Sequence, residues 1–390
     1  MHKNRNVVII GLIAVVNALG YGIIIPILYT YSIKFGLSDF QNGLLFAVFA
    51  LCSFISTPVI GRLSDKYGRR PLLIASITGT AVSFVMMAFA PNVAILFLAR
   101  ALDGITAGNW PVIAAVISDT TEPHERAKGF GIIGASFNFG FIFGPAISGI
   151  TYGIWAGLPF LIAAAITVVA VLATYFYLPE TNKHIGQVHK GKLFDFAQLW
   201  HAIKDPAVGI TFMITFLFSL ALFMFFLGFQ PYMVKGLHLS PFEISALFTT
   251  YGVVGFISQG LLGRVTGRFG LKRVFSTALF IIMLTFVAMF SIHAIIPFVV
   301  LNVILGIANP VINPLTQTIL SQETDPKLQG AMQGMNASYM NLGQILGPIL
   351  GGAAATISLQ MPFLAAAVII FVCFILSFRV MKHKAHHNIA

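Results

Sequence analysis

The sequence has 390 residues, of which 57% are hydrophobic and only 9% are charged. A soluble globular domain carries about 25% charged residues, so this chain lacks the polar surface that a water-soluble fold needs. Its formal net charge of +11 does not indicate nucleic-acid binding, because the basic residues fall in short gaps between apolar runs. We therefore expect most of the chain to face lipid.

The sequence also argues against a metal site, a cofactor or an enzyme. Cys52 and Cys373 are the only cysteines, and they lie far apart in apolar segments, so neither a disulfide framework nor a metal site is expected. There is no nucleotide-binding G-x-x-x-x-G-K-[ST] loop, no nucleophile elbow and no pair of close acids within a span. We expect no cofactor.

Twelve apolar stretches follow one another along the chain, each about as long as the ~20 residues that a helix needs to cross a bilayer. They predict an all-α integral membrane fold. The expected spans are residues 7–29, 42–61, 72–91, 93–117, 128–151, 157–178, 207–231, 243–262, 274–292, 295–320, 330–353 and 361–380.

An even number of spans places both termini on one side of the membrane, and the basic residues indicate the cytoplasm. With that orientation, only Lys34 and Lys235 of the 23 Lys and Arg residues lie on outer loops, and Arg100 lies within a span. The longest connection, residues 179–206, is then cytoplasmic. Its apolar and polar residues alternate as in a short amphipathic helix on the membrane surface. We expect it to link two bundles, residues 1–178 and 207–390.

In the first span, Asn17 and Tyr21 are spaced i, i+4 and share one helix face. The connection after the second span reads G-R-L-S-D-K-Y-G-R-R from Gly61 to Arg70. Its carboxylate, Asp65, lies among cations, stays ionised and can pair across helix ends. The alternative is a solvated charged turn that only sets the topology.

The fourth span contains Asp103, the only acid of the sequence well inside a span, three residues after Arg100. Because charges within a membrane are costly and usually functional, Asp103 is the candidate proton carrier. The alternative is a permanent ion pair that neutralises Arg100. Asn109 and Trp110, followed by Pro111, add polar groups that line a cavity or bridge helices.

Spans five and eleven carry a gapless repeat of the form G-x8-G-x3-G-P-x3-G, offset by about 203 residues. Asn138 and Asn341 occupy matching places in it. Together with a related match after spans two and eight, the repeat predicts two similar six-helix bundles. Its members are Gly131, Gly140, Gly144, Pro145 and Gly149 in the first half, and Gly334, Gly343, Gly347, Pro348 and Gly352 in the second.

Spans seven and ten complete the candidate cavity. Phenylalanines of span seven fall on two different helix faces, so at least one of the two faces must pack against protein or lipid. In span ten, Asn309, Asn313 and Gln317 are spaced i, i+4, i+8, so we expect them along one face, either lining a cavity or bridging helices.

These motifs resemble those of the major facilitator superfamily over essentially the whole chain. Gly61, Asp65, Gly68, Arg69 and Arg70 are similar to its signature loop, which implies a cytoplasmic latch of the outward-open state. The glycine–proline pattern of span five resembles the antiporter motif of the drug–proton antiporters with twelve spans. Among these, the first span resembles the tetracycline-exporter branch in Asn17, Gly20, Gly22 and Pro26. The branch has acids where this chain has Asn17 and Ser83.

The resemblance implies a secondary active transporter: a monomeric, proton-coupled exporter of small amphipathic compounds in the bacterial inner membrane, working by alternating access. We expect a neutral, zwitterionic or weakly charged substrate. The candidate substrate-binding residues are Asn17, Tyr21, Asn109, Trp110, Asn138, Asn309, Asn313, Gln317 and Asn341. One alternative is an importer or facilitator of a metabolite such as a sugar or organic acid, and another is a membrane receptor or scaffold that transports nothing.

Overall fold

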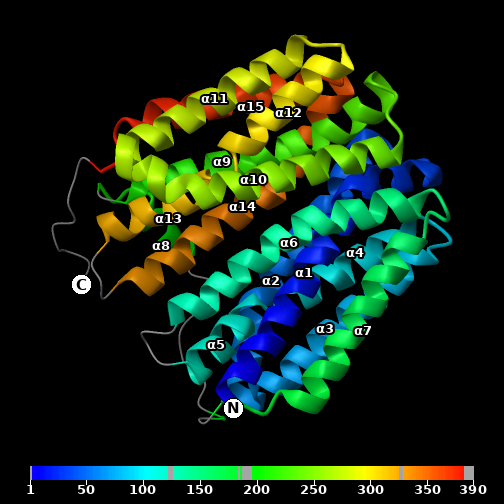
Figure 1. Cartoon of the computed structure of the whole chain (residues 1–390), viewed down its shortest axis with the longest axis vertical. Coiled ribbons are helices and arrows are strands. Elements are labelled where there is room, and N and C mark those ends of the chain that lie inside the picture. Colours follow the sequence, from blue (N-terminus) through cyan, green and yellow to red (C-terminus); the bar gives the residue numbers. More distant parts are fainter. Residues whose placement is uncertain are drawn as a thin grey trace. The chain divides into compact units, whose positions relative to one another are not determined.

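The structure is a computed structural model that describes residues 2–121, 126–182, 185–186, 196–206, 208–324 and 328–381 (Figure 1). All regular secondary structure in these residues is helical, which confirms the predicted all-α fold. Eight of the described helices are long and apolar enough to cross a membrane.

Within the described residues, the first half of the chain has eight helices and one short turn of 3-10 helix. Their bounds are α1 His2–Ser32, η1 Ile33–Phe35, α2 Asp39–Tyr67, α3 Arg69–Ala88, α4 Val93–Ala107, α5 Trp110–Thr120, α6 Arg126–Tyr152, α7 Leu158–Tyr177 and α8 Phe196–Ala202. The second half contains α9 Gly209–Pro231, the π-helical turn η2 Tyr232–Gly236, α10 Pro241–Phe269, α11 Leu271–Ser291, α12 Ile295–Ala308, α13 Ile312–Glu323, α14 Gln329–Ile357 and α15 Met361–Ser377.

The predicted spans four and ten are each broken into two helices. Gly108 and Asn109 separate α4 from α5, and residues 309–311 separate α12 from α13. Prolines explain both breaks, because proline has no N–H to continue a helix and fits best in a first turn. Pro111 lies in the first turn of α5, and Pro310 lies between α12 and α13. The spacing predicted one helical face for Asn309, Asn313 and Gln317. Because of the break, Asn309 does not continue the face that carries the other two residues.

The predicted cytoplasmic helix is α8, whose side chains are described from Leu199 onward. The apolar residues of α8, together with Ile203, which follows it, have two different environments. Leu199 and Ile203 pack against the buried cluster around Phe212 and Tyr339, whereas Trp200 is exposed. Residues 183–184 and 187–195 of the predicted connection lie outside the described residues.

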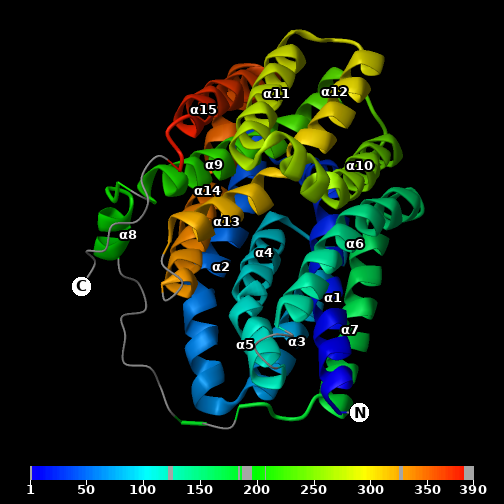
Figure 2. The same cartoon turned by 60° about the vertical axis from the view of Figure 1, so that its left-hand side comes forward.

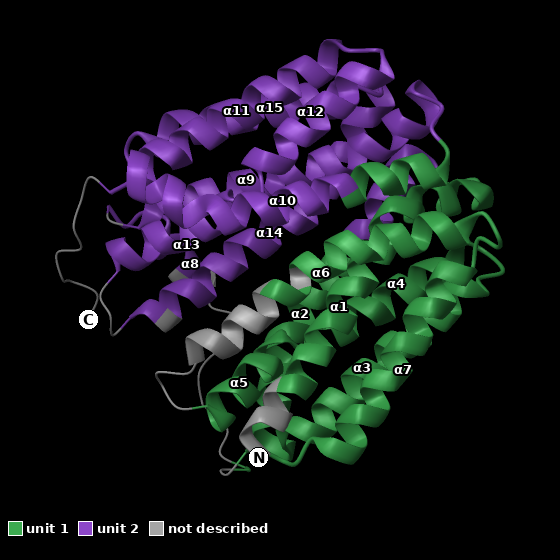
Figure 3. Cartoon of the chain, viewed as in Figure 1, with its two compact units in different colours: residues 1–37, 48–194, 240–249 green, residues 38–47, 195–239, 250–390 purple. Residues whose placement is uncertain are grey.

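The chain forms two compact units (Figure 3). Unit 1 comprises residues 1–37, 48–194 and 240–249, and unit 2 comprises residues 38–47, 195–239 and 250–390. In unit 1, α1 packs against α6 and α7, and α3 packs against α4 and α7 (Figures 1 and 2). In unit 2, α9 packs against α14 and α15, and α11 packs against α12 and α15. The same packing scheme thus occurs twice, as the repeat predicted.

Local details of the turns repeat as well. Ser38 and Gln41 form a reciprocal capping box at the start of α2, and Ser240 and Glu243 form one at the start of α10. Gly68 before α3 and Gly270 before α11 both have positive φ, at 105° and 85°. A residue with a side chain is strained in that conformation, so both turns favour glycine.

The repeated glycines bring helix backbones into contact. A Cβ on Gly144 of α6 would lie 2.6 Å from the Gly22 Cα of α1, and one on Gly347 of α14 would lie 2.7 Å from the Phe223 Cβ of α9. Side chains at these places would separate the helices, so close packing explains these motif positions. Gly131 lies in α6, but its surroundings are outside the described part of the chain.

Gly347→Ala is expected to lower the stability of the protein, whereas Gly334→Ala is expected to leave it unchanged or raise it. The first substitution overpacks the α9–α14 contact and costs about 1–3 kcal/mol. The second puts a methyl group, in the same helix and the same motif, where no described atom beyond its chain neighbours and the nearby backbone of α14 lies within 4 Å. Thermal unfolding of the two variants in detergent, followed by size-exclusion chromatography, measures the difference. Equal melting temperatures would contradict the close-packing explanation.

Candidate functional site: a buried ion pair and a charged turn

Unit 1 contains a buried ion pair within its fourth span. Arg100 Nη1 lies 2.8 Å from Asp103 Oδ2, and both residues are on α4, one turn apart. Only 3% of Arg100 and 5% of Asp103 is exposed, so both charges have lost their water. Removing two charges from water is expensive, and close pairing offsets only part of that cost.

Aromatic rings complete the surroundings of this pair. The Arg100 guanidinium lies over the ring of Phe49 on α2, 4.3 Å from its centroid. Tyr21 on α1 packs edge-on against the same ring, with the centroids 5.3 Å apart. The Phe49 face therefore stabilises the cation by a cation–π contact where water is excluded.

Hydroxyl groups of α3 line the other side of α4. Thr80 and Thr106 are hydrogen-bonded at 2.9 Å, and the Ser76 hydroxyl donates to the Thr106 carbonyl. Ser83 is fully buried and donates to the Thr80 carbonyl at 2.8 Å. These hydroxyl groups thus satisfy one another and nearby carbonyls in the contact between α3 and α4.

Three other candidate residues of unit 1, Asn17, Asn109 and Trp110, lie at or beside the break between α4 and α5. Asn17 donates from Nδ2 to Asn109 Oδ1 at 3.0 Å, which ties α1 to this break. Asn109 is fully buried, and Trp110 packs against an apolar cluster formed by α1, α3, α5 and α7. Asn138 is half-buried on α6. The structure brings Asn17 and Asn109 together as an interhelical pair.

In unit 2 the candidate residues differ in exposure. Asn309, in the break between α12 and α13, is 4% exposed, and its Nδ2 has no partner among the described residues. Asn313 and Gln317 are exposed on α13, and Asn341 is half-buried on α14. Packing inside unit 2 accounts for four buried phenylalanines of α9: Phe212, Phe218, Phe225 and Phe229. Three of them make ring contacts: Phe212 with α14, Phe225 with α11 and α15, and Phe229 with α12.

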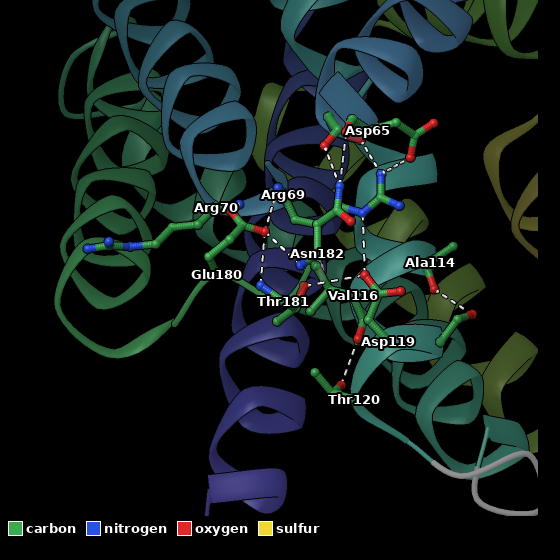
Figure 4. Close-up of polar contacts among 12 residues, drawn as sticks. Asp65, Arg69, Arg70, Ala114, Val116, Asp119, Thr120, Glu180, Thr181 and Asn182 are labelled. Carbon is green, nitrogen blue, oxygen red and sulfur yellow. Dashed lines mark hydrogen bonds and ion pairs between the residues drawn. The ribbon is translucent and has the colours of Figure 1, made fainter. Parts of the chain in front are cut away.

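The signature loop forms a dense polar cluster in unit 1 (Figure 4). Arg69 Nη1 lies 2.5 Å from Asp65 Oδ1 and donates to Ser64 Oγ at 2.6 Å. Its Nε lies 3.4 Å from the Asp119 carboxylate at the end of α5. One guanidinium therefore joins α2, α3 and α5. Its side chain is only 13% exposed, so it is screened by water less than an ordinary surface charge.

Glu180, just after α7, is one of the cluster residues that the sequence analysis did not predict; Asp119 and Asn182 are others. Its carboxylate accepts hydrogen bonds from the backbone N–H groups of Arg69 at 2.9 Å and Arg70 at 3.1 Å, the first residues of α3. A carboxylate in this place satisfies unpaired N–H groups and is favoured by the helix dipole. A Cβ on Gly68 would collide with it. The sequence signal that pointed to such a residue was the excess of cationic side chains in the loop, because these cations need acidic partners from elsewhere in the chain.

The segment after α7 also binds the turn directly. Asn182 donates from Nδ2 to the Asp65 carbonyl at 3.0 Å, and the Gly186 N–H donates to the same carbonyl at 3.3 Å. Arg70 donates to the Tyr175 carbonyl and lies over the Tyr175 ring. The start of the predicted linker is thus fixed to the α2–α3 turn.

Comparison with known proteins agrees with this architecture. The family model described as Major Facilitator Superfamily matches residues 10–227 and 211–390. The chain is 32% identical over 369 residues to the tetracycline resistance protein, class B, of Escherichia coli, covering 89% of this chain and 88% of that protein. It is 28% identical over 363 residues to multidrug resistance protein 2 of Bacillus subtilis (strain 168), covering 91% and 90%.

Solved structures show the same fold. A bacterial homolog to the human lysosomal transporter Spinster superposes with a TM-score of 0.79 at 17% identity, over 99% of both chains. A nucleoside transporter, NupG, does so with a TM-score of 0.79 at 16% identity, over 97% of this chain and all of that one. At such identities the likeness concerns the fold alone. The family model and the relatives go further: the chain belongs to the Major Facilitator Superfamily and is an integral membrane transporter, not an enzyme.

Proposed function

We propose that the chain is a proton-coupled exporter of small amphipathic compounds that works by alternating access. The observation that carries the proposal is the buried Arg100–Asp103 pair, an acid within a span whose charge can be cancelled by a proton. The glycine–proline motif of α6 and the names of the relatives, which denote resistance to tetracycline and to several drugs, favour export.

Coupling requires that proton binding favour one conformation over the other. With Asp103 ionised, its attraction to Arg100 holds both side chains at 2.8 Å on one turn of α4. With Asp103 protonated, that attraction is lost, and Arg100 retains the face of Phe49. The two protonation states are therefore stabilised by different surroundings. Rocking of the two six-helix halves, residues 1–178 and 207–390, provides these different surroundings.

For substrate binding we propose the amide and hydroxyl groups near the helix breaks and on the exposed face of α13. They are neutral, whereas Arg100 and Asp103 compensate each other. A multiply charged metabolite would lose its hydration without gaining a counter-charge, which is costly. The proposed residues are Asn17, Tyr21, Asn109, Trp110 and Asn138 from unit 1, and Asn309, Asn313, Gln317 and Asn341 from unit 2.

We place both termini in the cytoplasm and the protein, as a monomer, in the bacterial inner membrane, because the basic residues cluster on that side and both relatives are bacterial. In this orientation the Asp65–Arg69 cluster is cytoplasmic and acts as a latch on the opening of that side. The second half has Gly267 where the first has Asp65, so the latch is one-sided.

Flux measurements on purified protein in liposomes test the proposal. An imposed pH gradient is expected to drive tetracycline against its concentration gradient, in the direction opposite to proton flow, and an uncoupler is expected to abolish this movement. Uptake down a gradient that ignores the uncoupler would indicate a facilitator. Binding to a protein partner with no flux of any solute would indicate a receptor or scaffold.

Asp103→Asn is expected to reduce pH-driven tetracycline flux by about tenfold or more while leaving the melting temperature close to that of the unchanged protein. Asparagine keeps the shape and a hydrogen bond to Arg100 but cannot bind or release the proton. Glu243→Gln is the matched control, because it neutralises an exposed acid at the start of α10. Normal pH-driven flux in the Asp103 variant would rule out this residue as the proton carrier.

Asp65→Asn is expected to slow turnover several-fold and to change the equilibrium affinity for tetracycline little. The substitution removes the 2.5 Å ion pair with Arg69, and so shifts the conformational equilibrium without touching the proposed binding residues. Lys66→Gln changes the charge of the same turn but leaves the pair intact, and it serves as the control. Loss of affinity at an unchanged turnover rate would be incompatible with a latch.

A further inference from the structure

The face of α13 that is not packed against unit 2 is unusually polar for a membrane-spanning helix. Ile312, Leu315, Ile319 and Leu320 are buried on one side of the helix. Asn313, Gln317, Thr318 and Gln322 are exposed on the other. Amide side chains are costly against lipid, so this face must meet water or a polar ligand.

A shallow hollow of about 530 Å³, open over most of its boundary, lies against this face. Its wall is formed by Pro314, Gln317, Thr318, Ser321 and Gln322 of α13 and by Gln333 of the neighbouring α14. Gln329 joins the two helices, because its Nε2 donates to Ser321 Oγ at 3.1 Å. The volume is within the range of about 300–1,000 Å³ that small-molecule sites occupy.

The side-chain amides of the three glutamines in this hollow are available to hydrogen-bond with a ligand. Gln317, Gln322 and Gln333 make no hydrogen bond with any residue that the structure describes, whereas the Thr318 hydroxyl already donates to the Pro314 carbonyl at 2.8 Å. Each amide offers two N–H donors and one carbonyl acceptor. Together they can recognise a solute that presents several donors and acceptors side by side.

Among the residues that the structure describes, no ionisable side chain lines the hollow. Glu323, the nearest acid along α13, is 3% exposed and its oxygens accept from the Thr211 hydroxyl at 2.7 Å and the Met381 N–H at 2.8 Å. Its charge is engaged with α9 and the segment after α15. A charged ligand in the hollow would therefore lack a partner of opposite charge.

We propose that this hollow is a substrate subsite for the hydroxyl- and amide-rich part of a solute of no net charge. The inference rests on the proposed function and extends it, because it assigns Thr318, Ser321, Gln322 and Gln333 to substrate recognition alongside Gln317. The hollow extends along most of α13, from Pro314 to Gln322.

Two probes and two kinds of variant test the subsite. Tetracycline has many hydroxyl and amide groups and a net charge near zero, whereas tetraphenylphosphonium is a permanent cation without hydrogen-bonding groups. Gln317→Leu and Gln333→Leu are expected to raise the Kd for tetracycline about tenfold and to change the Kd for tetraphenylphosphonium less than about twofold. Gln317→Glu is expected to strengthen tetraphenylphosphonium binding. Equilibrium binding to purified protein measures both constants.

Gln360→Leu is the matched control, because Gln360 precedes α15, makes no side-chain cap and lies outside the hollow. An unchanged tetracycline Kd in both leucine variants would overturn the subsite. Alkylation of Gln317→Cys by a water-soluble maleimide, read by mass spectrometry, is a second measurement if the leucine variants do not fold, and tetracycline is expected to protect the cysteine. Absence of protection also overturns the subsite. If the unchanged protein bound neither probe, the proposed function itself would fail.

Discussion

The constraint on which the rest of this structure depends is the cost of an unpaired polar group in a lipid-facing fold. Helices satisfy the backbone, and buried hydroxyls such as Thr167 and Thr174 donate to carbonyls one turn earlier, at 2.6 and 2.7 Å. Because of the same cost, the polar groups that do not follow this rule stand out. Arg100 and Asp103 are retained as a pair under a phenylalanine ring, although two apolar residues would pack more cheaply. Because burying this pair costs free energy, we infer that it has a role that apolar residues cannot perform.

Close contact between helices is the second condition on which this fold depends, and the sequence predicted it. The repeated glycines predicted two similar bundles, and Gly144 and Gly347 do lie against the backbones of α1 and α9. Helix length, apolar runs and the positive φ turns at Gly68 and Gly270 were also readable, because each depends on neighbouring residues only. The breaks at Asn109 and Asn309 were signalled by prolines, but their consequence for the face of span ten was not.

Other features depend on residues far apart in the chain, and a single sequence does not encode them visibly. Glu180 looks like a solvated acid after a helix, yet it caps α3 more than a hundred residues earlier in the chain. Asn17 and Asn109 each resembled a cavity residue, and their mutual hydrogen bond depends on how α1 and the α4–α5 break are rotated. Helical rotation is set by packing, so a stripe of polar residues predicts a face without predicting what the face meets.

The two units differ in the chemistry of their polar groups, and this difference bears on coupling. Unit 1 holds the buried Arg100–Asp103 ion pair and the acid-capped turn. In unit 2, Lys272 reaches the Phe378 and Val380 carbonyls at 2.9 Å, and the described lining of the hollow on α13 consists largely of neutral amides and hydroxyls. A solute without net charge interacts weakly with a proton site by direct electrostatics. If proton and solute bind as proposed, each must favour a conformation of the whole protein, and their coupling is the difference between those preferences.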